Sequence, residues 1–492
     1  MGTLMCKCVV IIVLASMGLA TTTTCGADME VGFARVNITP PMGIRMRGHP
    51  FNFFAKGVES HLYANAMCIG DGSTKVMVVS CDVAGVSNEM SARVCRKIEQ
   101  DLGIPEGNVI VSATHTHSGP QTSAGRRGNT LGNDLISGYA EKLENNIVAA
   151  LKQAHSNMQK GKLTVAYGEL PGIGFNRRFI MSNRSIQTHP LTLDPHIVGP
   201  EGPDAKDLFV FCGYDEDGKV LGTAINFSCH ATVMERRNEY ISADFPGKTC
   251  DFVNDQLGGG ALTLYLQGTC GNICQVNPLD GTHKEVGLEW TKVMGRKIGS
   301  KALELIENDA FEASGPLRTI SREIELSLRQ VDPVLAAWAL HYKEVPEGNP
   351  VLSDYGAEKI DEIELPMMGL TNLFETPWWA NRYARTVRRY AQNNARTAHV
   401  TVKVFAQDNW ALVSLPGEFF MEFGDAIHER SPFETTIVAG YANGANGYIP
   451  TRKAFSRGGG YETNIGTARF TPDAGYLVVD AVVEMLQALR DK

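Results

Sequence analysis

The amino-acid sequence predicts an α/β protein, in which a large, layered domain of sheets and helices is built around a mixed, partly parallel sheet. Strand and helix signals alternate through the first half, the pattern of parallel strands joined by helices. The composition, with 43% hydrophobic and 20% charged residues, is close to that of an average globular protein. No internal repeat or low-complexity linker divides residues 28–492, so we expect one large domain.

The parallel part of the sheet is predicted from residues 75–113. An apolar strand over 75–80 is followed by helical periodicity over 87–102 and by a second apolar strand over 108–113, which makes a βαβ unit. Elsewhere in the first half, we expect helices over 134–156, 244–256 and 286–306 and strands over 163–167, 208–213 and 220–228.

The pattern changes beyond Gly315. An alternating strand is predicted over 317–328, and a helix-rich stretch with several arginines follows it. We interpret residues 330–398 as a helical insertion packed on the core. Strands over 399–405 and 410–415 and a helix over 419–429 then resume the α/β pattern.

Residues 1–27 have the layout of a secretory signal peptide. A positive charge at Lys7 precedes an apolar run over 8–20, and small residues at Cys25 and Ala27 suit cleavage before Asp28. The apolar run is too short to cross a membrane. The mature protein is therefore predicted to be secreted or periplasmic. Lipid anchoring through Cys25 is the less favoured alternative, because threonines occupy positions 22–24, where such sites have aliphatic and small residues.

Charge and cysteine usage narrow the class of protein. The net charge is only −8, and no basic stripe interleaved with aromatic residues is present, so we expect no nucleic-acid partner. Several cysteines outside the leader lie in apolar, strand-like runs, which favours buried thiols over a disulfide framework. Cys270 and Cys274, four residues apart in a Gly-rich loop, could pair or remain free.

Two histidines follow the predicted strand over 108–113. His115 and His117 lie in the segment THTHSGP, at the carboxyl end of a parallel strand, where open α/β sheets place their ligand crevice. The two-residue spacing lets one imidazole bind a metal while the other faces a substrate. The alternative is a polar turn in which both rings bond to backbone groups.

Two further strand ends carry candidate metal ligands. His230 follows the strand over 220–228, and Glu418 follows the strand over 410–415. Two histidines, one glutamate and a water are a sufficient set for a catalytic zinc site, so His115, His230 and Glu418 predict one. Taken singly, His230 could be structural, Glu418 could interact with a helix dipole, and Asp244 could cap a helix or orient a ligating histidine.

Five ordered segments resemble the catalytic domain of the neutral, non-lysosomal ceramidases. They are THTHSGP, FNRR, NFSCHATVM, LPGEF and GYANGANGYIPTRKAFSRGGGYET, and the resemblance covers nearly all of residues 28–492. It implies a zinc-dependent hydrolase that cleaves the amide of an N-acyl sphingosine or related N-acyl lipid. It also implies lipid contact of a peripheral kind.

The resemblance assigns roles to seven residues. Carried across motif by motif, the zinc ligands are His115, His230, Glu418 and Tyr448, and the catalytic residues beside the metal are His117, Arg177 and Tyr461. On the bare sequence Tyr448 would be read as a strand or loop aromatic, and Arg177 as a surface or salt-bridged arginine.

Two departures from the family concern the substrate. The family's Gly-Asp-x-Ser-Pro-Asn segment is Gly-Asn-Ile-Cys-Gln-Val-Asn-Pro here, from Gly271 to Pro278, so its serine is missing. The sequence also ends soon after Tyr461, where family members have a further β-sandwich domain. The alternatives are therefore a zinc amidase or esterase acting on a polar, carbohydrate or peptide-linked acyl group, and a binding protein without turnover.

Overall fold

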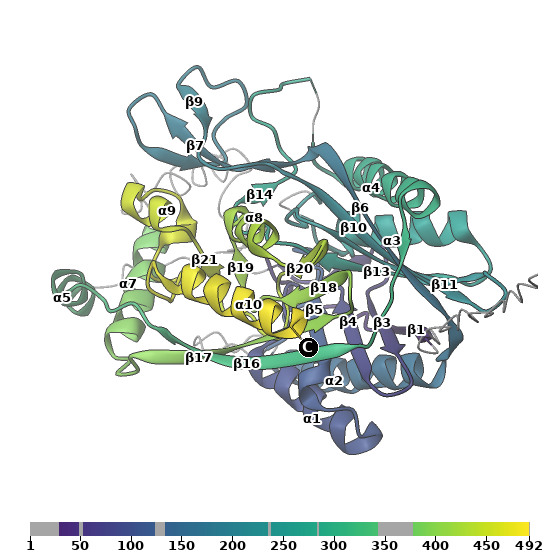
Figure 1. Ribbon diagram of the computed structural model, residues 1–492. Helices are drawn as coiled ribbons and strands as arrows, with labels where there is room; N and C mark the ends of the chain where they lie inside the picture. The colour runs from purple at the N-terminus through teal and green to yellow at the C-terminus, as the bar shows by residue number, and fades with distance from the viewer. Residues whose placement is uncertain are drawn as a thin grey trace, which may run out of the picture.

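The computed structural model describes residues 29–48, 53–123, 133–234, 238–282, 285–342 and 377–491. The predicted leader, residues 1–27, lies outside this part of the chain. Two sheets with their helices dominate the architecture (Figure 1). None of the described helices is long and apolar enough to span a membrane.

The larger sheet has ten strands and is mixed, as predicted. Its main path runs β13-β11-β10-β6-β1-β3-β4-β5, and only β4–β5 and β11–β13 pair in parallel along it. The strands are β1 (Glu30–Asn37), β3 (Tyr63–Gly70), β4 (Lys75–Cys81), β5 (Val109–Ala113), β6 (Gln159–Asn176), β10 (Ala205–Asp215), β11 (Val220–Phe227) and β13 (Leu262–Gln267), with β14 (Ile273–Cys274) and β15 (Phe311–Glu312) paired to β6.

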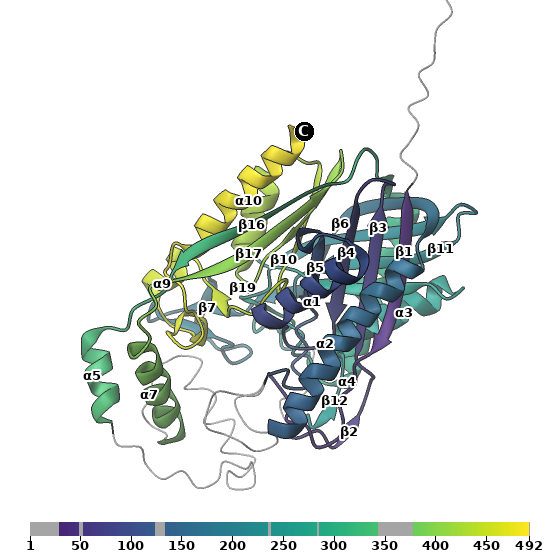
Figure 2. The same ribbon diagram turned by 90° about the horizontal axis from the view of Figure 1, so that it is seen from below.

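The predicted βαβ unit is confirmed. Helix α1 (Asn88–Leu102) connects β4 to β5, and it begins after Ser87, whose side chain accepts a hydrogen bond from the backbone N–H of Met90. Figure 2 shows α1 and α2 (Asn133–Ser156) on one side of β1, β3 and β4. Helices α3 (Asp244–Leu257) and α4 (Leu288–Asn308) pack against the part of the sheet formed by β6, β10 and β13.

The smaller sheet has four strands, in the order β16-β17-β18-β20. They are β16 (Arg318–Ser327), β17 (Thr397–Ala406), β18 (Trp410–Ser414) and β20 (Thr435–Ala439). Helices α8 (Met421–Arg430) and α10 (Ala474–Arg490) bury one face of this sheet, and α10 lies along it in Figure 1. The other face shares a hydrophobic core with the ten-stranded sheet, in which the rings of Phe211 and Trp410 lie 5.0 Å apart.

Three short pairings complete the strands. The parallel pair β19 (Glu418–Phe419) and β21 (Tyr448–Ile449) carries two of the predicted ligands, Glu418 and Tyr448. The others are β2 (Gly57–Val58) with β12 (Tyr240–Ile241), and β7 (Arg178–Met181) with β8 (Ile186–Thr188) and β9 (Ile197–Pro200). The helix predicted over 419–429 begins only at Met421, because Glu418 and Phe419 pair with β21 instead.

The helical stretch predicted over 330–398 is described in part. Helix α5 (Pro333–His341) packs against α7 (Pro377–Ala391), and Ala339 and Val387 form a small cluster with Ile465. Residues 343–376 lie outside the described chain. The short helix α9 (Arg452–Arg457) precedes the segment that carries Tyr461.

The ten-stranded sheet curls so that distant strands of its path meet. The Ser80 hydroxyl on β4 donates a hydrogen bond to the carbonyl oxygen of Tyr265 on β13, at 2.5 Å. Because β13 neighbours β11, this closure brings the carboxyl ends of β5 and β11 to one place.

Candidate metal centre

The three strand ends singled out in the sequence meet at one point. His115 follows β5, His230 follows β11, and Glu418 lies in β19 just after β18. Glu418 Oε2 lies 3.6 Å from His115 Nε2 and 3.5 Å from His230 Nε2. The Tyr448 hydroxyl lies 3.5 Å from His230 Nε2, so all four predicted ligands gather.

Both histidines present an unprotonated Nε2 to this point. His115 Nδ1 lies 2.6 Å from the carbonyl oxygen of Ala84, and His230 Nδ1 lies 2.6 Å from that of Cys270. Since a carbonyl oxygen only accepts, each Nδ1 carries the hydrogen and each Nε2 carries a lone pair. This is how histidine ligands of zinc are commonly oriented by their surroundings.

Burial keeps these imidazoles neutral. It lowers the pKa of His115 to about 3, against the opposing effect of Glu418, and the pKa of His230 well below its ordinary value, helped by the charge of Arg177. Neutral histidine is the form that binds a metal.

Glu418 Oε2 is the most informative atom of the site. It is buried, and no described donor forms a hydrogen bond with it. A carboxylate oxygen in such surroundings is unfavourable unless a hydrogen-bond donor or a cation satisfies it. The two nearest nitrogens offer lone pairs rather than hydrogens, so the arrangement fits a metal cation.

His117 lies beside this ligand set. Its Nε2 is 3.1 Å from His115 Nε2, and because the latter carries no hydrogen, the hydrogen of this contact lies on His117. Gly48 has a φ of 107°, and a Cβ there would lie 2.6 Å from the His117 side chain. Glycine at position 48 is thus required both by its backbone angle and by the approach of His117. The nitrogens of His115, His117 and His230 lie within 4.8 Å of one another.

Arg177 is buried, and it is not a surface residue. Its Nη2 donates to the Tyr448 hydroxyl at 3.1 Å and to the carbonyl oxygen of Gly271 at 2.7 Å, while its Nε donates to Glu462 Oε1 at 3.0 Å. The Tyr461 ring lies edge-on to Tyr448, with 5.7 Å between the ring centres, and 5.3 Å from the Arg177 guanidinium. Arg177 and Tyr461 therefore contact Tyr448 from outside the cluster of ligand atoms.

A buried ion-pair network supports Arg177. Glu462 also accepts from Arg178 Nη1 at 2.9 Å and from the Thr188 hydroxyl at 2.9 Å, and Arg178 Nε donates to Glu201 at 2.6 Å. Burial alone would raise the pKa of Glu462, but Arg177 and Arg178 hold it below its ordinary value.

Several residues around the site were missed in the sequence. Glu462 directly follows Tyr461, but its place in the sequence does not distinguish it from a glutamate on the protein surface. Tyr441 stacks on His115 with 4.0 Å between ring centres, and Gln267 is a buried glutamine at the end of β13. Only their tertiary contacts set these residues apart.

Two open questions from the sequence are answered by the structure. All eight described cysteines are free and buried, Cys270 and Cys274 included, which confirms the prediction of buried thiols. Asp244 is the first residue of α3, not its N-cap, and its carboxylate accepts from the backbone N–H groups of Val233 and Met234 at 3.0 Å each. The Asp244 carboxylate therefore stabilises the loop after His230, and none of its described contacts involves the His230 imidazole.

Gln275, which stands where the family has its serine segment, is buried. Its Oε1 accepts a hydrogen bond from the Thr232 hydroxyl at 3.3 Å, two residues after His230. The Gln275 side chain therefore contacts the loop that follows the predicted ligand His230.

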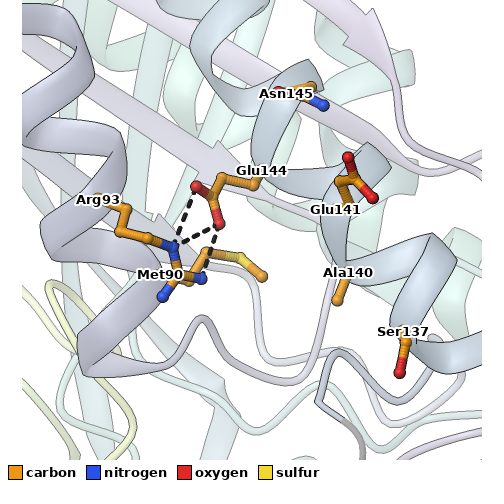
Figure 3. A pocket seen from close by; sticks show the side chains of 7 residues that line it. All are labelled: Met90, Arg93, Ser137, Ala140, Glu141, Glu144 and Asn145. Carbon is orange, nitrogen blue, oxygen red and sulfur yellow. Dashed lines mark hydrogen bonds and ion pairs between the residues drawn. The ribbon is translucent and has the colours of Figure 1, made fainter. Parts of the chain in front are cut away.

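A cavity of about 480 Å³ lies away from these residues, between α1 and α2. Figure 3 shows its lining residues, with Arg93 bonded to Glu144 across the groove. It contains none of the predicted site residues, so we assign it no role in the chemistry.

The comparisons with known proteins point to one family. Residues 29–263 match the family described as neutral/alkaline non-lysosomal ceramidase, N-terminal. The neutral ceramidase of Pseudomonas aeruginosa is 23% identical over 474 residues, which is 89% of this chain and 68% of that protein. Neutral ceramidase B of Dictyostelium discoideum is 24% identical over 56% of this chain and 43% of its own length. The neutral ceramidase of Mycobacterium tuberculosis is 24% identical over 43% of this chain and 32% of its own length.

The fold agrees with this relationship. The crystal structure of the Pseudomonas aeruginosa neutral ceramidase superposes with a TM-score of 0.69 at 19% identity, covering 94% of this chain and 75% of that chain. The resemblance predicted from the motifs is thereby confirmed, and the chain is related to the neutral/alkaline non-lysosomal ceramidase family.

Proposed function

We propose that this protein is a zinc-dependent amidohydrolase in which His115, His230, Glu418 and Tyr448 bind the metal. The observation that carries the proposal is the buried Glu418 Oε2 without a hydrogen-bond donor, 3.5 to 3.6 Å from two unprotonated imidazole nitrogens. Two histidines and a glutamate are a usual donor set for catalytic zinc. Ligands scattered too far apart for one ion would instead have favoured a binding protein without turnover.

Tyr448 is the unusual member of the set. Burial raises the pKa of its phenol well above the ordinary value, and the neighbouring Glu418 adds to this, whereas Arg177 acts in the opposite direction. The Arg177 Nη2 donates to the phenol oxygen at 3.1 Å, so that oxygen keeps a lone pair for a cation. We infer that Arg177 favours Tyr448 as a ligand by stabilising negative charge on its oxygen.

Bound zinc supplies Lewis acidity, which activates water at neutral pH and polarises an acyl carbonyl. The protein's own residues supply the rest of the proposed chemistry. His117, whose Nε2 faces the ligand cluster, is suited to take a proton from the attacking water and then, as an imidazolium, to give that proton to the leaving nitrogen, which returns the ring to its neutral form. Tyr461 is suited to donate to the developing oxyanion. Arg177 is assigned to holding charge rather than to proton transfer, because its pKa is raised well above the ordinary value despite burial, through Tyr461, Tyr448 and Glu462.

The proposed substrate is an N-acyl sphingosine or a related N-acyl lipid, which the protein meets by peripheral contact with a lipid surface. The names of the relatives support a ceramide-like amide. The proposed signal peptide places this activity outside the cytoplasm. Because Gln275 replaces the family's serine segment close to the His230 loop, we expect ceramide turnover to be lower than that of the Pseudomonas enzyme. A polar acyl substrate is the alternative that this change favours.

Metal analysis of the purified protein and hydrolysis of a substrate panel test the proposal together. The panel contains N-acyl sphingosines, N-acyl amino sugars and simple esters. About one zinc per chain and hydrolysis of N-acyl sphingosines are expected. Bound zinc with hydrolysis of only the polar substrates would change the substrate class, and a protein that neither binds zinc nor hydrolyses any member would refute the proposal.

A further inference from the structure

We infer that Gln267 is a positioning residue for the metal centre, because its side chain ties together the two strand ends that carry His115 and His230. This inference rests on the proposed function. The residue is the last of β13 and is fully buried. None of its atoms belongs to the predicted ligand set.

Three hydrogen bonds make the connection. Gln267 Nε2 donates to the carbonyl oxygen of Thr114 at 3.1 Å and to that of Cys229 at 2.7 Å, and Oε1 accepts from the Cys229 N–H at 3.1 Å. Two carbonyl partners and one N–H partner fit only one orientation of the amide, so all three contacts depend on a glutamine's combination of donors and acceptor.

The bonded residues directly precede the ligands. Thr114 precedes His115, and Cys229 precedes His230. His115 has a φ of 62°, in the left-handed region that a residue with a side chain keeps only when its surroundings hold it there. The strands β5 and β11 lie far apart along the path of the sheet, and no backbone ladder joins them. The Gln267 amide connects the two strand ends through the residues that precede the predicted ligands. The backbone N–H of His117 donates to the Ala231 carbonyl oxygen at 3.0 Å and so connects the same two segments just after those ligands.

The Gln267 backbone extends the link to a third segment. Its carbonyl oxygen accepts from the Gly440 N–H at 2.8 Å, and Gly440 precedes the Tyr441 that stacks on His115. The separation of the two imidazoles therefore depends in part on the geometry at Gln267. Residues that hydrogen-bond to metal-ligand side chains change metal affinity by roughly 10- to 100-fold when replaced, and we expect an effect in the same range from a residue that holds the ligands' backbone.

A second buried glutamine provides a matched control. Gln407 is also fully buried, its Nε2 donates to the Gly315 carbonyl at 2.7 Å, and its Oε1 accepts from Trp410 Nε1 at 3.0 Å. It lies next to the four-stranded sheet and contacts no predicted ligand in any described interaction. Gln407→Met thus measures what the loss of a buried glutamine does to stability alone.

The experiment compares wild type, Gln267→Met, Gln267→Glu and Gln407→Met, each stripped of metal and titrated with Co²⁺. The measured quantities are the Co²⁺ dissociation constant, the visible absorption spectrum of bound Co²⁺ and the Tm of the metal-free protein. Gln267→Glu keeps the size of the side chain and its acceptor oxygen but loses the amide N–H donors. It therefore tests the positioning role even if Gln267→Met does not fold.

We expect both methionine variants to lose Tm, whereas only the Gln267 variants bind Co²⁺ roughly 10- to 100-fold more weakly and with an altered spectrum. Unchanged affinity and spectrum in the Gln267 variants would overturn the positioning role while leaving the metal centre intact. Equal weakening in Gln407→Met would also overturn it. A wild-type protein that binds no Co²⁺ would instead refute the metal centre itself, and the role of Gln267 with it.

Discussion

Replacing Glu462 with glutamine should damage both stability and turnover, because this one carboxylate neutralises Arg177 inside the protein. Glu462 is fully buried, the Arg177 side chain is 2% exposed, and their contact is 3.0 Å long. Within the described chain, Arg177 has no other carboxylate as an ion-pair partner, whereas Arg178 keeps Glu201 at 2.6 Å. The variant therefore leaves one buried guanidinium without its counter-charge.

The cost can be estimated. Removing one partner of a buried ion pair costs about 3 to 5 kcal/mol. Unfolding entropy of about 2.1 cal/mol/K per residue gives about 1 kcal/mol/K for 492 residues, so the Tm should fall by about 3 to 5 °C. Because the arginines hold the Glu462 pKa below 4.5, the pair stabilises the protein above that pH, and the stabilisation is lost as the pH falls through the folded pKa. The difference from wild type should therefore shrink in acid.

Glu201→Gln is the control for this experiment. It removes a buried partner of Arg178 but leaves the Arg177–Glu462 contact and the Tyr448 hydrogen bond in place. Scanning calorimetry at neutral and acid pH and turnover of the best substrate give the readouts. Glu462→Gln should lower both Tm and turnover, and Glu201→Gln mainly Tm. A Tm change under about 1 °C for Glu462→Gln, or equal losses of turnover in the two variants, would refute the reasoning.

Three further predictions concern the ligands, their neighbours and a separate acidic cluster. Glu418→Ala should abolish stoichiometric zinc, as measured by elemental analysis, and retention of a full equivalent would remove Glu418 from the ligand set. His117→Ala and Tyr461→Phe should lower kcat while zinc stays nearly stoichiometric, and zinc loss would instead make those residues ligands. Burial, Asp207, Glu422 and Glu429 raise the pKa of Asp425 from its ordinary value of 3.8 to about 7. Ionisation of this carboxyl group therefore costs the folded state stability as the pH rises from about 3.8 to about 7. Asp425→Asn should thus lose less Tm than wild type between pH 5 and pH 8, and parallel losses would contradict this.

The periodicity of the sequence determined which elements form and where the ligands follow them. The βαβ unit was predictable because apolar strands and an amphipathic helix are local patterns, and Ser87 capped the helix as such residues do. Its parallel strands β4 and β5 were confirmed in register from Met77 with Val109 to Cys81 with Ala113. Histidines at the ends of β5 and β11 were visible for the same reason.

Element boundaries were predicted less well where long-range pairing decided them. Strand β6 extends over Gln159–Asn176, far beyond the predicted 163–167, because several strands hydrogen-bond along its length. Helix α8 begins later than predicted because Glu418 pairs with Tyr448, thirty positions further along the chain. That pairing is also what brings the two predicted ligands together.

The sequence by itself therefore determined the strand ends, their chemistry and, through ordered motifs, the family. Only the tertiary structure decided which of those ends meet and how their side chains are oriented. The Nδ1–H groups of His115 and His230 are fixed by carbonyl oxygens from Ala84 and Cys270. Arg177 is fixed by Glu462, 285 residues away in sequence. No local pattern encodes such contacts, because they arise only when the curled sheet brings segments that are distant in the chain into hydrogen-bond range.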